Sequence, residues 1–503
     1  MMVARQMTDA WRLSDLLQGI AVLPPAADRK ILGLNIDSRK VRAGDLFIAC
    51  TGTKTHGREY ISQAVQNGAQ AVLLERAADV VPDEAALQAH YGVPVITVVG
   101  LGRLVSTIAG RFYGHPSLQM TLVGVTGTNG KTSCSQFIAQ ALSHDEPCGV
   151  IGTLGNGLFG QLAETGHTTP DPVTLQALLV DFYRAGARQA VMEVSSHGLE
   201  QGRVAGLAFD VAVFTNLSRE HLDYHGNMAA YGRAKRALFE MPGLQYAVIN
   251  HDDAYGRELL ASLPVGVKAI SYGLDLAGRA MIRGGELRLS RQGLAMKVAT
   301  PWGEGLLRST LLGRFNASNL LAALAVLLVL DIPLTQALQR LSGVRTVPGR
   351  MEAYGGDQHH PLVVVDYAHT PDALQQVLLA LREHCKGELW CVFGCGGNRD
   401  KGKRPQMGEI AARCADRIII TDDNPRHEDA DGIVADILAG MGEFKPAVIR
   451  DRAAAIRQAV SAARPEDVVL IAGKGHEDYQ LVGDSKLAFS DSAQVQALLR
   501  GEP

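Results

Sequence analysis

The sequence lacks several features that would assign it to other classes of protein. It has no excess of basic charge, because 49 lysines and arginines oppose 52 aspartates and glutamates and give a formal net charge of -3. A non-specific nucleic-acid binder needs a basic surface, so we do not expect a nucleic-acid partner. The longest apolar run, 320–330, is far shorter than the roughly 20 residues that cross a bilayer, so we expect a buried helix and no membrane insertion.

Export signals and paired cysteines are also missing. The first twenty residues mix arginines with aspartates and have no unbroken apolar core, so we expect no signal peptide. The 7 cysteines are scattered along a large chain, which favours reduced thiols in the cytoplasm. Cys391 and Cys395 have no second pair at zinc-binding spacing, and we expect no zinc site there.

The length and composition are those of a globular enzyme with several domains. The chain has 503 residues, of which 47% are hydrophobic and 20% charged, and this length predicts about three domains. We place the three domains at 1–100, 101–343 and 344–503. Val347-Pro-Gly349 has the composition of a linker or hinge.

Strands and helices are predicted to alternate. The expected strands are mostly continuous apolar runs, typical of parallel sheets buried on both faces: 45–50, 71–74, 93–99, 148–151, 189–194, 211–215, 246–250, 362–365, 389–393, 417–420, 447–449 and 468–471. The expected helices include 59–67, 104–112, 133–142, 320–330 and 335–341. Residues 269–307 are predicted to be rich in β-strands. The predicted fold is α/β with three domains, in which a central phosphate-loop ATPase-type parallel sheet precedes a C-terminal Rossmann-like domain.

The most informative segment runs from an apolar strand into Gly127-Thr-Asn-Gly-Lys-Thr132 and then a helix. The glycines allow backbone N–H groups to turn toward phosphate oxygens, Lys131 adds a positive charge, and the Thr132 hydroxyl suits Mg²⁺. Val125 stands where the strict pattern has glycine, but the Gly-Lys-Thr core is intact. This segment predicts a site for ATP or GTP.

Acids and imidazoles follow two neighbouring strands. Glu193 ends one strand and suits Mg²⁺ directly or through water, although a helix cap or a surface acid is the alternative. His221 follows the next strand, where it could be a second ligand or, like most single histidines, structural.

Six motifs, in order along the chain, resemble the Mur ligases of peptidoglycan synthesis. They are Thr126-Gly-Thr-Asn-Gly-Lys-Thr132, Glu193-Val-Ser-Ser-His197, Asn216-Leu-Ser-Arg-Glu-His-Leu-Asp223, Tyr231-Gly-Arg-Ala-Lys235, Asp366-Tyr-Ala-His369 and Gly473-Lys-Gly-His-Glu477. The resemblance implies an enzyme that uses ATP to join an amino acid to a UDP-N-acetylmuramoyl acceptor through an acyl phosphate. Asp423-Asn-Pro-Arg426 resembles the signature of members that add meso-diaminopimelate to UDP-N-acetylmuramoyl-L-alanyl-D-glutamate.

The resemblance also implies the catalytic and nucleotide-binding residues. Catalysis is expected to involve Lys131, Glu193, His221 and Lys235, with Thr132, Glu193, His221 and Lys235 around Mg²⁺. By resemblance, Lys235 is carbamylated by CO₂, whereas the alternative is a solvated helix lysine. The residues expected to bind ATP are Gly127, Thr128, Asn129, Gly130, Lys131, Thr132, Asn316, Arg350 and Asp366. A salt bridge in the linker is the alternative role of Arg350.

Two further groups are expected to bind the substrates. The acceptor group is Ile36, Ser38, Thr53, Lys54, Thr55, His167, Thr168, Thr169, Ser195, Gln201 and Arg203, most of which could instead be ordinary polar loop residues. His167 stands where related enzymes often have Asn. The amino-acid group is Arg399, Asp423, Asn424, Pro425, Arg426, Gly473 and Glu477. Arg426 suits the distal carboxylate of meso-diaminopimelate, which lysine lacks.

The expected enzyme is a monomer in cell-wall biogenesis. Folylpolyglutamate synthetase also activates a carboxylate with ATP, but it would need a pterin site and would leave Asp423-Asn-Pro-Arg426 without a clear purpose. A phosphate-loop switch that hydrolyses ATP to regulate a partner is an alternative from another class. ATP turnover that needs neither an amino acid nor a UDP-linked acceptor would favour the switch.

Overall fold

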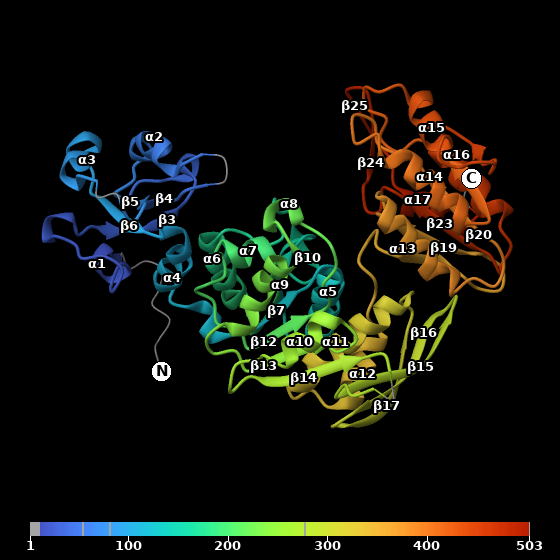
Figure 1. The fold of residues 1–503 in the computed structure, drawn as a ribbon, viewed down its shortest axis with the longest axis horizontal. Coiled ribbons are helices and arrows are strands. Elements are labelled where there is room, and N and C mark those ends of the chain that lie inside the picture. Colours follow the sequence, from blue (N-terminus) through green and yellow to red (C-terminus); the bar gives the residue numbers. More distant parts are fainter. Residues whose placement is uncertain (1–10, 53–54, 80–81, 276–277, 502–503) are drawn as a thin grey trace. The chain divides into compact units, whose positions relative to one another are not determined.

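The computed structural model describes residues 11–52, 55–79, 82–275 and 278–501 (Figure 1). Strands and helices alternate along most of the chain, which confirms the predicted α/β class. The chain divides into two compact units. The first comprises residues 1–272 and 325–330, and the second comprises 273–324 and 331–503.

The first unit begins with a small parallel sheet of order β3-β4-β5-β6. Its strands are Gly33–Asn35, Asp45–Ala49, Ala71–Arg76 and Val95–Val99. Apolar side chains fill both faces, with Leu46 in one cluster and Phe47 in the other. The surrounding elements are β1 (Trp11–Arg12), α1 (Leu13–Leu16), η1 (Pro25–Ala27), β2 (Lys30–Ile31), η2 (Ser38–Lys40), η3 (Gly57–Tyr60), α2 (Ile61–Gln66) and α3 (Glu84–Tyr91).

A larger sheet in the same unit carries the phosphate loop. In the order β10-β9-β8-β11-β7-β12-β13-β14, its strands are Gln161–Ala163, Gly155–Leu158, Cys148–Gly152, Gln189–Glu193, Thr121–Thr126, Val211–Phe214, Tyr246–Asn250 and Lys268–Gly273. From β8 to β14 the strands are parallel, and β7 lies between β11 and β12. The residues that follow these three strands therefore meet at one edge of the sheet.

Helices cover this sheet and connect its strands. They are α4 (Leu101–Phe112), η4 (Pro116–Gln119), α5 (Lys131–Leu142), α6 (Pro172–Arg184), α7 (Ser196–Glu200), α8 (Leu222–His225), α9 (Met228–Arg236), η5 (Ala237–Glu240) and α10 (Ala254–Leu260). The buried residues of β7, β11 and β12 pack with α6 in one apolar cluster that includes Leu122, Leu179 and Phe214.

The second unit begins with three antiparallel strands, β15 (Ile282–Ser290), β16 (Gly293–Thr300) and β17 (Gly303–Ser309). They are followed by α11 (Arg314–Val329) and α12 (Leu334–Ser342). His384 fastens this segment to the C-terminal sheet, because its Nε2 accepts from Gly313 N at 2.8 Å and its Nδ1 lies 2.6 Å from Ser290 O. An amide N–H can only donate, so the proton is on Nδ1 and the imidazole is neutral.

The C-terminal sheet has the order β18-β19-β23-β20-β21-β22. Its strands are Glu352–Gly355, Leu362–Asp366, Val468–Ala472, Leu389–Phe393, Arg417–Ile420 and Ala447–Val448, all parallel except β18. Apolar clusters cover both faces. The remaining elements are α13 (Pro371–Arg382), α14 (Lys403–Cys414), α15 (Ala430–Leu438), α16 (Arg452–Ala462), β24 (Tyr479–Val482), β25 (Ser485–Ala488) and α17 (Asp491–Leu499).

The element boundaries differ slightly from the sequence-based expectations. The helix predicted at 59–67 divides into η3 and α2, because the His56 side chain accepts from Arg58 N and tightens the chain first into a 3₁₀ turn. The cysteines, all 7 of them, are free thiols. Within the part of the chain that the structure describes, no helix is both long and apolar enough to cross a membrane.

Candidate active site

The phosphate loop connects the end of β7 to the start of α5. Gly127 has a φ of +146°, and a Cβ at this position would lie 1.9 Å from Thr215 Oγ1. Gly130 has a φ of +85° and directly precedes α5. These two conformations require or favour glycine, and they leave the positive N-terminal end of α5 at the loop. The local backbone is therefore that of an anion-binding turn.

The loop is fastened to the segment after β12, a connection that the motifs alone did not predict. Thr128 N donates to Asn216 O at 2.8 Å, and Asn129 N donates to Asn216 Oδ1 at 3.0 Å. Thr215 Oγ1 donates to Asn129 O at 2.6 Å. The position of Thr215 and Asn216 immediately after a buried strand was the available signal.

Lys131 folds back over the loop. Its Nζ donates to Gly127 O at 3.0 Å and to Thr128 O at 2.8 Å. Burial lowers the pKa of Lys131, while Glu193 and Glu220 act in the opposite direction. The amine thus lies at the phosphate loop, with a carboxylate near it.

Glu193 lies at the end of β11 and is 1% exposed. Its Oε2 accepts from Thr132 Oγ1 at 2.8 Å, and its Oε1 accepts from Thr153 N at 2.8 Å. Burial raises the pKa of Glu193, although the bonds from Thr153 and Thr132 oppose the shift. The structure therefore brings the predicted pair Thr132 and Glu193 together. Because Glu193 is buried, the alternative that it is a surface acid is wrong. Thr153 was missed, because nothing in its local sequence marks it.

Lys235 is buried in α9, with 1% of its surface exposed, so it is not a solvated lysine. Its Nζ donates to Gly127 O at 2.7 Å and lies 4.3 Å from the centroid of the Tyr231 ring. Burial, followed by repulsion from Lys131, lowers the pKa of Lys235 to about 6. The fold thus holds a largely neutral amine beside the phosphate loop at pH 7.

His221 lies just before α8 in a left-handed conformation, with φ of +54°. Its side chain is 44% exposed, and its ring centroid lies 4.9 Å from that of His197 and 6.1 Å from that of Tyr231. Tyr231 therefore contacts both His221 and Lys235. The Tyr231 hydroxyl also lies 3.2 Å from Thr128 Oγ1, which joins this cluster to the phosphate loop.

Several predicted acceptor residues form one network next to Glu193. Thr169 Oγ1 donates to Glu193 O at 2.9 Å and accepts from Ser195 N at 3.0 Å. Arg203 donates to Thr169 O at 2.6 Å and to Gln201 Oε1 at 3.0 Å. Burial lowers the pKa of Arg203. Nearby, Thr168 Oγ1 lies 3.0 Å from Thr153 Oγ1.

The other predicted acceptor residues have local contacts. Ser38 is buried and donates to Gln63 Oε1 at 2.7 Å, whereas Ile36 is exposed. Thr55 O accepts from Gly52 N at 2.9 Å. His167 is exposed in the segment between β10 and α6. Thr53 and Lys54 lie outside the described residues.

The nucleotide residues predicted in the second unit have structural partners. The Asn316 amide is buried, where it donates to Leu312 O at 2.8 Å and accepts from Asn319 Nδ2 at 3.2 Å. The Arg350 guanidinium lies 5.0 Å from the Tyr367 ring centroid. Asp366 accepts from Met351 N and Ala368 N, both at 2.8 Å, and burial raises the pKa of Asp366.

The residues predicted to bind the amino-acid substrate gather at the carboxyl ends of β21 and β23. Asn424 Nδ2 donates to Glu477 Oε2 at 2.9 Å, and Lys474 Nζ donates to Asn424 Oδ1 at 3.1 Å and Glu477 Oε2 at 3.0 Å. Lys474 is 0% exposed and was not predicted, although it lies within a quoted motif. Burial raises the pKa of Asp423, and a Cβ on Gly473 would lie 2.6 Å from Asp423 Oδ2.

Arg399 and Arg426 flank Gly396. A Cβ on Gly396 would lie 2.9 Å from Arg426 Nη1 and 3.6 Å from Arg399 Cγ. Arg426 Nη1 donates to Gly397 O at 3.0 Å, and Arg426 has a φ of +53°. Two loops, one carrying Arg399 and the other Pro425 and Arg426, therefore pack against each other.

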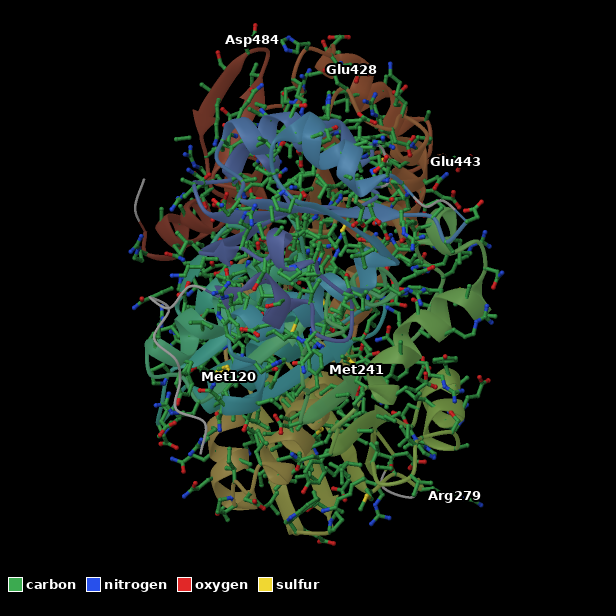
Figure 2. All side chains as sticks on the ribbon, turned by 90° about the vertical axis from the view of Figure 1, so that its left-hand side faces the viewer. Met120, Met241, Arg279, Glu428, Glu443 and Asp484 are labelled. Atoms are coloured by element: carbon green, nitrogen blue, oxygen red, sulfur yellow. The ribbon has the colours of Figure 1, made fainter. Side chains whose placement is uncertain are left out.

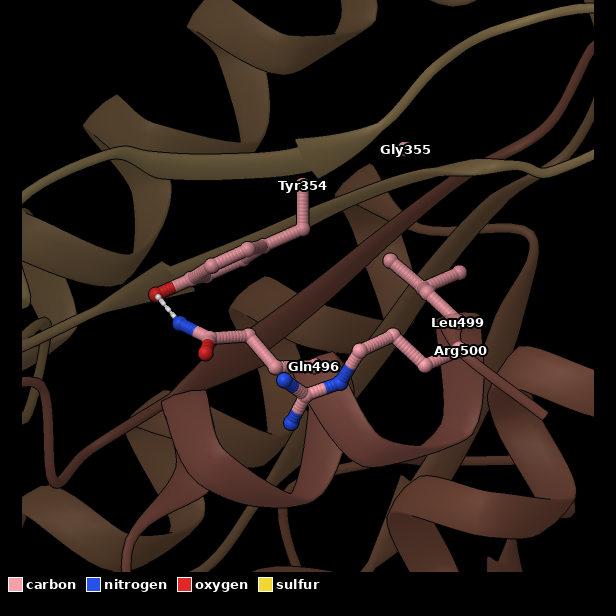
Figure 3. A pocket seen from close by; sticks show the side chains of 5 residues that line it. All are labelled: Tyr354, Gly355, Gln496, Leu499 and Arg500. Atoms are coloured by element: carbon pink, nitrogen blue, oxygen red, sulfur yellow. Dashed lines mark hydrogen bonds between the residues drawn. The ribbon is translucent and has the colours of Figure 1, made fainter. Parts of the chain in front are cut away.

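A surface hollow elsewhere in the second unit is separate from these residues. It has a volume of about 240 Å³ and is lined by Tyr354, Gly355, Gln496, Leu499 and Arg500 (Figure 3). Gln496 Nε2 lies 3.5 Å from Tyr354 Oη in it. None of the five lining residues is a predicted site residue.

Comparison with known proteins places this arrangement in a family. The sequence matches "Mur ligase family, catalytic domain" over 30–113, "Mur ligase middle domain" over 125–327 and "Mur ligase, glutamate ligase domain" over 349–475. A relative from Alkalilimnicola ehrlichii, named "UDP-N-acetylmuramoyl-L-alanyl-D-glutamate--2,6-diaminopimelate ligase", is 51% identical over 491 residues, which are 97% of this chain and 98% of the relative. A Pseudomonas aeruginosa protein of the same name is 51% identical over 94% of this chain and 96% of its own.

A solved structure titled with the same enzyme name has a TM-score of 0.77 and 36% sequence identity, and it covers 98% of this chain and 99% of its own. The chain belongs to the Mur ligase family, as its motifs predicted. The predicted three-domain α/β fold is confirmed by the same likeness.

Proposed function

We propose that the chain is an ATP-dependent ligase that joins meso-diaminopimelate to UDP-N-acetylmuramoyl-L-alanyl-D-glutamate in cytoplasmic peptidoglycan precursor synthesis. The observation that carries the proposal is the cluster of Lys131, Glu193 and Lys235 at the phosphate loop. The names of relatives that are 51% identical along nearly the whole chain support the choice of substrates. The domains are proposed at 1–100, 101–343 and 344–503, and the chain is proposed to act as a monomer.

The reaction has two bond-forming steps. A carboxylate oxygen of the acceptor bonds to the γ-phosphorus of ATP as the bond to ADP breaks, which leaves an acyl phosphate. The amine then bonds to the acyl carbon, loses a proton and displaces phosphate. In the first step two anions approach each other, so Lys131 and the N-terminus of α5 lower the repulsion between them.

The residues around Glu193 fit a Mg²⁺ ion. Glu193 and Thr132 supply a buried carboxylate oxygen and a hydroxyl oxygen 2.8 Å apart, which are ligand types that Mg²⁺ prefers. Thr132, Glu193, His221 and the carbamate of Lys235 are the proposed direct or water-mediated ligands. When bound, Mg²⁺ neutralises phosphate charge.

Lys235 fits a carbamate for electrostatic reasons. CO₂ reacts with a neutral amine, and burial provides one by lowering the pKa of Lys235 to about 6. A C–N bond forms between the amine and CO₂ and a proton leaves, so the neutral amine becomes an anion that is attracted to the cation of Lys131. Lys235→Ala is expected to be poorly active and to be rescued in part by a short carboxylic acid, and full activity in CO₂-free buffer would contradict this role.

The amino-acid site is proposed around Arg399, Arg426 and Asp423. Guanidinium groups pair with carboxylates in a fork, and Arg426 is proposed to hold the distal carboxylate of meso-diaminopimelate. Gly473, Asn424, Pro425 and Glu477 are proposed to complete this site. A site built for that carboxylate should reject lysine, which would leave the guanidinium unpaired.

The test is ADP release from the purified chain across a panel of UDP-muramoyl acceptors and amino acids. We expect release only when ATP, Mg²⁺, the dipeptide acceptor and meso-diaminopimelate are all present. Glutamate-dependent release with a folate acceptor would instead indicate folylpolyglutamate synthetase. Release without an amino acid or acceptor would indicate a phosphate-loop switch.

A further inference from the structure

Arg404, at the start of α14, is 0% exposed and lies beneath the two loops of the amino-acid site. Its Nη1 donates to Glu428 Oε1 at 2.9 Å and to Asp436 Oδ2 at 2.8 Å. Its Nη2 donates to Glu428 Oε2 at 2.8 Å and to Gly396 O at 3.3 Å. The guanidinium therefore joins the loop before α14 to the segment before α15.

Glu428 also contacts the loop before α14 directly. Figure 2 labels Glu428 on the C-terminal part of the chain. Its Oε2 also accepts from Asn398 N at 2.8 Å, and its Oε1 lies 3.0 Å from Lys401 Nζ. The hydrogen bonds to Arg404 are the main reason that the pKa of Glu428 is strongly lowered, so the carboxylate stays charged. A charged, bidentate pair fixes both distance and orientation.

The two loops that this pair joins also contact each other directly. Gly397 N donates to Asn424 O at 2.9 Å, and His427 N donates to Asn398 Oδ1 at 3.1 Å. A Cβ on Gly397 would lie 1.9 Å from Pro425 O, so the backbones are in direct contact.

We propose that Arg404 is a positioning residue that sets the geometry of Arg399 and Arg426 for the amino-acid substrate through Glu428 and the Gly396 carbonyl. Because it is fully buried, Arg404 does not touch the substrate itself. The inference deepens the proposed function, since it rests on these loops binding an amino acid. Misplacing a binding group by about 1 Å can lower catalysis about 10²-fold.

The test compares Arg404→Lys and Glu428→Gln with Ile410→Ala. The first two keep similar side-chain shapes but lose the charged fork, whereas Ile410→Ala removes apolar packing from the same helix, where Ile410 is 7% exposed. We expect the two fork variants to raise the KM for the amino acid about 10- to 100-fold while the KM for ATP changes less than about threefold. The double variant should lose little more than either single variant, because both single variants already break the bidentate bond between Arg404 and Glu428.

Hydrogen exchange provides a readout without any substrate. In the fork variants, peptides covering 396–399 and 424–428 should exchange faster, whereas α14 should stay protected. Ile410→Ala should instead loosen α14 and leave the KM for the amino acid unchanged. The proposal is overturned if the three variants behave alike, or if the fork variants leave both the exchange of these loops and this KM unchanged.

Assaying the wild type with the panel of acceptors and amino acids separates this inference from the proposed function. If the wild type prefers an amino acid other than meso-diaminopimelate, the substrate assignment fails, and the variants are measured with the preferred amino acid. If the wild type uses no amino acid, the loops are not an amino-acid site and the inference fails together with the function. If the wild type uses diaminopimelate and the fork variants change neither the exchange of these loops nor the KM for the amino acid, the inference alone is overturned.

Discussion

Lys235 should make the folded protein less stable at neutral pH than a variant with methionine at this position. The pKa of Lys235 falls from 10.5 to about 6 on folding. At pH 7 the lysine is charged in the unfolded chain and largely neutral in the folded one, so folding removes a proton from it. The cost is set by the difference between the unfolded pKa and the pH, which is 10.5 − 7 = 3.5 units. At 1.36 kcal/mol per unit this costs about 5 kcal/mol, which Lys235→Met abolishes.

Other contacts change this magnitude only moderately. Gly127 O loses the bond from Lys235 but keeps the one from Lys131 Nζ at 3.0 Å, so no carbonyl is left unpaired. Losing one hydrogen bond costs roughly 1 kcal/mol. A gain of about 3 to 4 kcal/mol is therefore expected at pH 7.

The pH dependence gives the sharper test. Because the folded pKa is depressed, the unfolded state binds more protons between about pH 6 and 10.5, and wild-type stability should rise with pH in this window. The advantage of Lys235→Met should therefore shrink by about 1.4 kcal/mol for each pH unit. Added bicarbonate should also reduce the stability advantage of Lys235→Met, because carbamylation favours the folded wild type.

The assay is urea unfolding in CO₂-free buffer at several pH values, followed by hydrogen exchange in β7 and α5. These elements report on the part of the chain that surrounds Lys235. A stability difference that does not change with pH would refute the reasoning. So would a methionine variant that is less stable than the wild type at pH 7.

Three further variants probe the phosphate and amino-acid sites. Lys131→Ala should abolish ligation in the ADP-release assay while thermal unfolding stays close to the wild type, and wild-type turnover at saturating ATP would contradict its role. Gly127→Ala places a Cβ 1.9 Å from Thr215 Oγ1, so ATP binding measured by calorimetry should be lost, and unchanged affinity would refute the loop geometry. Arg426→Ala should cost about 2 to 5 kcal/mol in kcat/KM for meso-diaminopimelate and erode its advantage over lysine; loss of ATP binding with the preference intact would show that Arg426 belongs to the nucleotide site.

Local patterns predicted the fold and the phosphate loop well, because both depend on neighbouring residues. Continuous apolar runs such as 189–194 and 468–471 became buried parallel strands. The glycine-rich turn at 127–130 lies between β7 and α5 as expected, and Lys131 and Thr132 begin the helix. Gly127 and Gly130 have positive φ values, which glycine adopts without strain.

The partners of the site residues could not be predicted, because they come from distant parts of the chain. Thr153 bonds to Glu193 across 40 positions, and Arg404 bonds to Glu428 across 24. In isolation, an arginine at the start of a helix resembles a solvated side chain. Only the fold removes Arg404 from water and gives it a charged partner.

The charge balance of the two candidate sites matches the charges of their proposed ligands. At the phosphate loop, the cation of Lys131 lies near Glu193, whose carboxylate is already bound by Thr132 and Thr153. A second buried cation there would repel the first, and the lowered pKa of Lys235 avoids this cost. In the C-terminal site, Lys474 is paired directly with Glu477, so its charge is compensated before any ligand arrives. The phosphate loop, with the cation of Lys131, therefore suits an anionic ligand. The C-terminal site suits a zwitterion, whose ammonium and carboxylate groups need partners of opposite charge at fixed positions.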